Sequence, residues 1–304
     1  MAPTIAAADV AIAAQLACLL EASAPKPGNV SPGRHFADAR YEEFLASAAA
    51  IGGPLAGAGA RPLGETVRRA VEATARWTRS NTNLGIVLLL APIARAASLS
   101  SRDDRTLRDA VRQVLGETTV ADAREVYAAI RLAAPGGLGR VADQDVAGEP
   151  TRTLLEVMRL AADRDAIARE YADAFATTFL AGVPALDRAR RDGLSWDDAV
   201  VETFLTLLGS TPDTHVARRA GPARAADVSS QARAALAAGG VRSDEGRIAI
   251  ARMDRALRDA RHLANPGTAA DLTAAAIFVV LLNGGWRVPP IAPAAPGGPD
   301  AAPR

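Results

Sequence analysis

The sequence predicts an all-α protein built as a single multi-helix, bundle-like domain. Alanine, the strongest helix former, dominates a composition that is 49% apolar but only 4% aromatic. Alternating runs of β-branched or aromatic residues, which would indicate strands, are scarce. Apolar residues instead recur at near-helical spacing in almost every segment outside the loops. We expect this domain to span residues 1–286, followed by a disordered Pro/Ala/Gly-rich tail over 287–304.

Helical periodicity begins at once in the first half of the chain. Val10, Leu16 and Leu20 are among the apolar residues at near-helical spacing that predict a helix over residues 5–23. A second helix contains Tyr41 and Phe44, and the Gly/Pro-rich segment 51–64 is expected to link helices. Further helices are predicted over 65–79, along the apolar run 84–94, and over 104–117 and 119–133.

The second half continues the pattern after a long loop that ends near Pro150. Helices are predicted over 151–163, 164–180, from Ser195 to about 209, over 224–238, over 244–263, and along the apolar segment to Leu282. The 244–263 helix has Asp254 and Arg258 four residues apart, which is typical of a solvated face.

Composition excludes several classes of function. A net charge of +1 with no basic stripe argues against a nucleic-acid partner. The apolar runs 84–94 and 274–282 are too short to span a bilayer, so no membrane partner is expected. Cys18 is the single cysteine and cannot form an internal disulfide, and no signal peptide is visible. These features predict a cytoplasmic location.

One stretch near the start contains the only lysine among the 35 basic residues, Lys26. The flanking Pro25 and Pro27 stiffen the backbone, and Gly28 allows a close backbone approach. A rigid loop could present this compact cation to a phosphate. The alternative is an ordinary Pro-Gly helix stop with a solvated lysine. Glu21, on the last helical turn, faces the unfavourable end of the helix dipole, which a nearby cation would explain.

Other polar loops also fall at helix ends. Asn81 and Asn83 precede an apolar helix, either as caps or as part of an anion site. Asp213 and His215 form either an acid–base or metal pair, or an ordinary turn. Asp271 near the start of the last helix is either stabilised by the dipole or holds a ligand. The five loops 21–38, 79–85, 134–145, 209–215 and 264–271 are predicted to converge at one end of the bundle.

These motifs, in this order, resemble the triphosphoribosyl-dephospho-CoA synthase family over about residues 15–282. They read Pro25-Lys26-Pro27-Gly28, His35-Phe-Ala-Asp38, Asn81-Thr82-Asn83, Pro135-Gly136-Gly137, Asp213-Thr214 and Pro266-Gly267-Thr-Ala-Ala-Asp271. The resemblance implies an all-α enzyme that converts ATP and 3′-dephospho-CoA to 2′-(5″-triphosphoribosyl)-3′-dephospho-CoA and adenine. The product is the precursor of the prosthetic group of citrate lyase and malonate decarboxylase acyl carriers.

Two departures from the family pattern keep alternatives open. Family members typically carry His-Lys after Asn-Thr, where this chain has Asn83-Leu84, and their GARGEA segment reads Pro-Gly-Gly-Leu-Gly-Arg140 here. The alternatives are a ribosyl transferase for another acceptor, such as a pterin in methanopterin-type one-carbon cofactor synthesis, an ATP or phosphate-ester hydrolase, and a non-catalytic helical nucleotide-binding protein.

The implied chemistry assigns roles to the loop residues. Displacement of adenine from the ribose needs a base, an acid for the departing adenine and cations for the triphosphate. Asp38, His35 and Asp213 are the predicted catalytic residues. Predicted substrate-binding residues are Lys26, Gly28, Asn29, Asn81, Asn83, His215 and Gly267.

The predicted cofactor is Mg²⁺, with ATP as substrate, held by Glu21, Asp38 and Asp271. His262, on the solvated 244–263 helix, is expected to be a bystander. The partners are small molecules, and the oligomeric state stays open, with a homodimer as one alternative.

Overall fold

Helices account for all the regular secondary structure in the described part of the chain. The computed structural model describes residues 5–99, 106–137, 139–259 and 261–286. Within these ranges there is no β-strand, and one isolated bridge joins Ser31 and Arg34. The all-α prediction is therefore confirmed. The predicted tail 287–304 lies outside the described residues.

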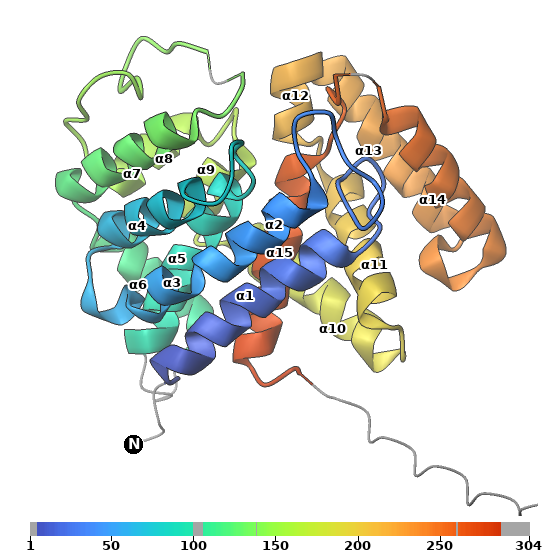
Figure 1. Cartoon of the computed structure of the whole chain (residues 1–304), viewed down its shortest axis with the longest axis horizontal. Helices are drawn as coiled ribbons and strands as arrows, with labels where there is room; N and C mark the ends of the chain where they lie inside the picture. The colour runs from blue at the N-terminus through green and yellow to red at the C-terminus, as the bar shows by residue number, and fades with distance from the viewer. Residues whose placement is uncertain (1–4, 100–105, 138, 260, 287–304) are drawn as a thin grey trace, which may run out of the picture.

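The helices follow one another with short connections (Figure 1). In chain order they are α1 (Ala7–Ser23), α2 (Tyr41–Ala50), α3 (Gly52–Ala56), η1 (Ala58–Ala60), α4 (Leu63–Ala75), α5 (Leu84–Leu99), α6 (Leu107–Gly116), α7 (Val120–Ala133), α8 (Leu154–Ala161), α9 (Ala166–Ala172), η2 (Thr178–Gly182), α10 (Val183–Arg191), α11 (Trp196–Ser210), α12 (Thr214–Ala220), α13 (Pro222–Ala237), η3 (Gly240–Arg242), α14 (Asp244–Leu257) and α15 (Gly267–Leu282).

Helix α15 is the centre of the molecule. Its residues are apolar all round, which is typical of a buried helix. It packs against α1, α5, α10 and α11, and Ile277 and Phe278 are completely buried. Figure 1 shows α15 passing between the group α4–α9 and the group α10–α14. The polar start of α15, which carries Asp271, is therefore brought to the junction of both groups.

Two loop predictions need correction. The 51–64 segment is not a plain linker, since it forms α3 and η1. The 209–215 loop is shorter than predicted, because the Asp213 side chain accepts a hydrogen bond from Val216 N and thereby starts α12 at Thr214.

Two helix predictions also need correction. The predicted 164–180 helix is broken after Ala172, where Ala174 and Phe175 take left-handed conformations. Arg108 donates hydrogen bonds to the carbonyls of Asp173 and Ala174 at this break. Helix α14 ends at Leu257, well before residue 263. In the described ranges, none of the helices has the length and apolar character that crossing a membrane requires.

Candidate active site

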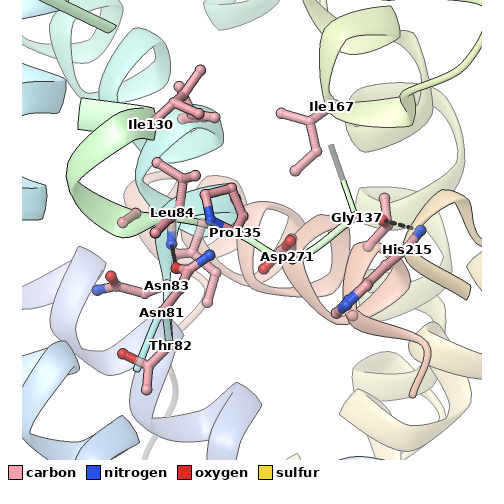
Figure 2. A pocket seen from close by; sticks show the side chains of 18 of the residues that line it. Asn81, Thr82, Asn83, Leu84, Ile130, Pro135, Gly137, Ile167, His215 and Asp271 are labelled. Carbon is pink, nitrogen blue, oxygen red and sulfur yellow. Dashed lines mark hydrogen bonds between the residues drawn. The ribbon is translucent and has the colours of Figure 1, made fainter. Parts of the chain in front are cut away.

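A cavity of about 1020 Å³ opens where the polar loops meet. All five loops that the sequence singled out contribute residues to its lining, for example Glu21, Asn81, Pro135, His215 and Asp271. Figure 2 shows Asp271 on α15 between Asn81 on one side and His215 on the other. The predicted convergence of these loops is thus present in the structure, and it forms this cavity.

Asp271 is one of the carboxyl groups that line this cavity (Figure 2). It packs against the backbone of Gly85 in the first turn of α5, where a Cβ atom would lie 2.0 Å from Asp271 Oδ2. Burial raises its pKa well above the usual range, and the negative charges of Glu21, Asp213 and Asp165 raise it further. Such a carboxyl group is suited to proton transfer near neutral pH.

We expect Gly85→Ala to lower activity strongly without loss of helix α5. Alanine favours a helix over glycine by about 1 kcal/mol, but its Cβ would displace the Asp271 carboxylate and also approach Ile167 Cδ1 at 2.8 Å. Gly53→Ala in α3 is the matched control, because its Cβ would meet nothing within 4 Å. Circular dichroism and the transfer assay proposed below should separate the two variants. Full activity in Gly85→Ala would mean that the position of Asp271 is unimportant.

Lys26 does not line the cavity, contrary to the picture of a loop that presents a cation. Its side chain is fully buried, and its Nζ lies 2.9 Å from Glu21 Oε1 and also donates to the Glu21 and Ala24 carbonyls. The lysine therefore neutralises Glu21, which does line the cavity. This pairing explains a carboxylate at the C-terminal end of α1. Contact between Lys26 and a phosphate stays a prediction.

The loop after Lys26 is held by α14, a connection that the sequence did not reveal. Asp254 accepts a hydrogen bond from Gly28 N at 2.8 Å and pairs with Arg34 at 2.6 Å and Arg258 at 2.9 Å. Arg258 also donates to the Asn29 carbonyl at 2.7 Å. The Asp254–Arg258 spacing is therefore a clamp on this loop rather than a solvated face, and only its i,i+4 geometry was visible in the sequence.

Asn29 faces the cavity wall beside the start of α15. Its Nδ2 donates to Asn265 Oδ1, and both residues line the cavity. Its Oδ1 is buried and has no hydrogen-bond partner among the described residues. Gly28 has φ of +79°, and its missing Cβ makes room for Leu257 and Pro266. Gly28 therefore serves close packing of the loop.

Asn81 and Asn83, two of the predicted binding residues, both make structural hydrogen bonds at this site. Asn81 Oδ1 accepts from Leu84 N at 3.0 Å at the start of α5. Asn83 is buried and donates to Thr74 Oγ1 at 3.1 Å on α4. Both residues belong to the cavity wall. Of the two, the exposed Asn81 is the one whose amide can reach a ligand.

Asp213 joins α12 to α15. It is buried, and its two carboxylate oxygens accept from Val216 N at 3.0 Å and Ala269 N at 2.8 Å. Burial raises its pKa to about 6 despite these hydrogen bonds. Asp213 does not belong to the cavity lining, so the structure favours a positioning role for it over the predicted catalytic one.

His215, in contrast, lines the cavity beside Gly267, where a Cβ atom would lie 2.2 Å from His215 Nδ1. Gly267 therefore admits the imidazole ring to the wall. Burial lowers the pKa of His215 to about 4, and the charges of Arg218 and Arg219 lower it further. His215 is neutral at pH 7 and can donate or accept a hydrogen bond there.

This pKa predicts a pH effect on stability. Between pH 4 and 6.5 the unfolded chain binds the His215 proton and the folded chain does not, so the contribution of His215 is complete above pH 6.5 and is lost as the pH falls to 4. The contribution of Asp213 to stability changes with pH in the opposite direction. Burial raises its pKa to about 6, so the folded chain keeps a proton that the unfolded chain has already lost, and stability falls as the pH rises toward 6.

Two residues, His215 and Asp213, thus change stability with pH in opposite directions, and we expect His215→Gln to remove the contribution of His215. Relative to wild type, the variant should gain on the order of 2–3 kcal/mol in free energy of unfolding as the pH falls from 6.5 to 4. Urea unfolding at several pH values measures this difference. A difference that does not vary with pH would show that His215 titrates normally.

The two predicted residues of the 35–38 motif lie at the edge of the site. His35 is exposed, and its Nδ1 accepts from Tyr41 N at 3.1 Å, so it belongs to the start of α2 and does not line the cavity. Asp38 is exposed and does line the cavity. The structure thus separates the predicted catalytic residues Asp38, His35 and Asp213, of which Asp38 alone belongs to the cavity wall.

Glu21, Asp38 and Asp271 are the residues predicted to bind magnesium. Within the described ranges, no group of three or more His, Cys, Asp or Glu side chains is arranged to hold a metal ion. Glu21 is already paired with Lys26. The predicted set of Glu21, Asp38 and Asp271 is therefore not a preassembled site. The other two predicted ligands, Asp38 and Asp271, line the cavity and fit an ion that arrives with substrate phosphates, because Mg²⁺ commonly uses one or two carboxylates in addition to phosphate oxygens.

Sequence reasoning missed the main cationic feature of the site. Six arginines from different segments line the cavity: Arg79, Arg131, Arg140, Arg164, Arg218 and Arg219. Because 34 of the 35 basic residues are arginine, no local signal distinguished these six. His262 was also misjudged, since it lies beyond α14 with φ of 49°, stacks on Phe36 at 3.9 Å between ring centroids, and lines the cavity.

Known proteins match this chain over most of its length. A model of the ATP:dephospho-CoA triphosphoribosyl transferase family matches residues 7–289. A crystal structure from Archaeoglobus fulgidus, provisionally named triphosphoribosyl-dephospho-CoA synthase, is 32% identical, has a TM-score of 0.62, and covers 80% of this chain and 100% of its own. A Pseudomonas syringae pv. tomato protein, provisionally named 2-(5″-triphosphoribosyl)-3′-dephosphocoenzyme-A synthase, is 31% identical over 71% of this chain and 69% of its own.

Other curated relatives match over shorter segments. The 2-(5″-triphosphoribosyl)-3′-dephosphocoenzyme-A synthase of Klebsiella pneumoniae is 38% identical over 32% of this chain and 34% of its own. A Pseudomonas aeruginosa relative is 40% identical over 34% of this chain and 36% of its own, so the match spans about a third of that relative. The family model and the longer matches confirm the resemblance seen in the motifs. The chain belongs to the ATP:dephospho-CoA triphosphoribosyl transferase family.

Proposed function

We propose that the chain transfers the triphosphoribosyl group of ATP to 3′-dephospho-CoA and releases adenine. Membership of the family supports the reaction. The observation that carries the proposal is a cavity lined by six arginines around a carboxyl group with a raised pKa, Asp271. The arginines suit a polyphosphate nucleotide, and the carboxyl group suits proton transfer.

The transfer balances without an oxidant or reductant. The 2′-hydroxyl oxygen of dephospho-CoA forms a bond to C1′ of the ATP ribose, and the bond from C1′ to N9 of adenine breaks. The bonding electrons leave with adenine, which gains one proton, while the acceptor hydroxyl loses one. The ribose passes through an oxocarbenium-like state, as in glycoside chemistry.

Asp271 is the residue that we assign to the acceptor proton. It faces the cavity, whereas Asp213 is committed to two backbone N–H groups. The nearby negative charge of Glu21 helps to raise the pKa of Asp271, which makes its carboxylate a stronger base. Mg²⁺, when bound, would neutralise part of the triphosphate charge, with Asp38 as its protein ligand.

The test separates transfer from hydrolysis. The purified chain is incubated with Mg·ATP, with and without dephospho-CoA, and adenine and inorganic phosphate are quantified by chromatography. We expect adenine release that depends on dephospho-CoA and no matching phosphate release. Phosphate release without adenine would indicate a hydrolase, and neither product would indicate a non-catalytic binding protein.

A different acceptor is the second candidate, and the wall around Asn83 favours it. Where relatives carry His-Lys, Asn83 is turned toward Thr74 and Leu84 is buried, so this stretch offers no cation to a substrate. If these positions serve the acceptor, ATP should bind while dephospho-CoA is a poor substrate. Efficient, saturable transfer to dephospho-CoA would rule out this alternative.

A further inference from the structure

We propose that Arg218 binds the triphosphate of the donor nucleotide, in a subsite formed with Asp165 and the backbone of Gly137. The inference rests on the proposed function for the identity of the ligand. It differs from the sequence-based prediction, which gave this role to Lys26. Three observations carry it: the pairing of Arg218, the glycine backbone beside it, and the different situations of the other cavity cations.

The first observation is that Arg218 is held in place and yet reachable. Its Nη1 lies 2.6 Å from Asp165 Oδ2, and the side chains of both residues are 24% exposed and line the cavity. Among the described residues, the Arg218 side chain donates to Asp165 through Nη1, and its buried Nε has no hydrogen-bond partner. An arginine fixed on one edge loses little conformational entropy when a phosphate binds its remaining donors.

The Asp165 carboxylate is stabilised by backbone N–H groups as well as by Arg218. Its Oδ1 accepts hydrogen bonds from Ile167 N at 2.9 Å and Ala168 N at 3.1 Å at the start of α9. The carboxylate thus stays stabilised by backbone donors when a phosphate shares the guanidinium.

The second observation concerns the backbone of Gly137. Gly137 has φ of +81°, and a Cβ atom there would lie 3.6 Å from Arg218 Cβ. Figure 2 shows Gly137 beside the segment that carries His215. Without side chains in the way, the glycine backbone lets a polyphosphate approach both the loop and the arginine.

The third observation is that the other cavity cations differ from Arg218. Arg219, on the same helix, uses Nη1 and Nη2 to bind the carbonyls of His262 and Arg261, each at 3.0 Å. Arg131 is bound to the Val146 carbonyl at 2.8 Å. Arg79, Arg140 and Arg164 are exposed, so fixing them on a ligand costs more side-chain entropy.

The location also suits the reaction. Arg218, His215 and Asp271, the carboxyl group assigned to the acceptor proton, all line the same cavity. A triphosphate held by Arg218 would bring the ribose of the same nucleotide to that side of the cavity. The subsite therefore gives the donor a direction: phosphates toward α12, with the ribose near α15.

The experiment measures binding of inorganic triphosphate and of adenosine to the full chain by calorimetry, without acceptor. Arg218→Gln should weaken triphosphate binding about 10- to 150-fold, the range for losing a hydrogen bond to a charged group, and leave adenosine binding unchanged. Arg219→Gln is the matched control. It removes the same charge from the same helix and should weaken triphosphate binding by no more than about threefold.

Circular dichroism and thermal unfolding first establish that both variants are folded. If Arg218→Gln is not folded, Arg218→Lys keeps a cation for Asp165 while losing the planar fork, and it should still weaken triphosphate binding. Unchanged triphosphate affinity in the Arg218 variant, an equal loss in both variants, or no triphosphate binding by wild type would overturn the inference. Arg218-dependent binding without any transfer would overturn the proposed reaction and leave the subsite standing.

Discussion

Asp271→Asn should lower the rate of triphosphoribosyl transfer by about 10²- to 10⁴-fold, the contribution typical of a general base. Asparagine has nearly the same shape as aspartate, so the packing against Gly85 should persist, and ATP affinity should change by only a few fold. Steady-state kinetics and nucleotide-binding calorimetry measure the two effects separately. An Asp271→Asn variant with normal turnover would show that another group takes the proton.

The same variant should be more stable than wild type at neutral pH. The folded-state pKa of Asp271 is raised, so the ionised carboxylate destabilises the fold above the ordinary pKa near 4 and has no such effect below it. The gain in free energy of unfolding should therefore be present at pH 7 and disappear toward pH 3. Asp227→Asn, at an exposed carboxylate outside the cavity, is the control and should change neither stability nor turnover. Lower stability of Asp271→Asn at pH 7 would contradict the assigned electrostatics.

Lys26→Ala should destabilise the protein by about 3–5 kcal/mol, because it leaves the buried Glu21 carboxylate without its partner. This result differs from the one expected for a loop that presents its cation to a phosphate, where the variant would weaken ATP binding and leave the fold unchanged. Equilibrium unfolding in urea at pH 7 provides the measurement.

A second variant tests the cause of that loss. The double substitution Lys26→Met/Glu21→Gln removes both charges and keeps the volume, so it should recover much of the lost stability. If Lys26→Ala instead unfolds like wild type and has lower ATP affinity, the ammonium group serves the nucleotide and not Glu21.

The helices and the positions of the loops could be predicted well from the sequence, because both depend on local chemistry. Apolar periodicity located α1, α7 and α15 to within a few residues. Gly, Pro, Asn and Asp marked the loops that line the cavity, since these residues cap and end helices regardless of what packs on them.

The functions of individual polar residues were less predictable, because they depend on partners far away in the chain. The sequence suggested that the Lys26 loop presents its cation, whereas in the fold Lys26 is buried against Glu21. Asp254 looked like a solvated residue, yet it binds Gly28 more than 200 residues away. Arg218 and its neighbour Arg219 differ only in their tertiary contacts. Arg218 pairs with Asp165, whereas Arg219 donates to two backbone carbonyls. No pattern along the sequence records such contacts.

We propose that the residues of this cavity transfer a triphosphoribosyl group from ATP to dephospho-CoA. The most direct test of this proposal is mass spectrometry of dephospho-CoA after incubation with Mg·ATP and the full chain, together with quantification of free adenine. We predict that the acceptor gains the mass of one triphosphoribosyl group for each adenine released, and that Asp271→Asn abolishes both changes together. Adenine release without a modified acceptor, or a modified acceptor with adenine still attached, would contradict the account.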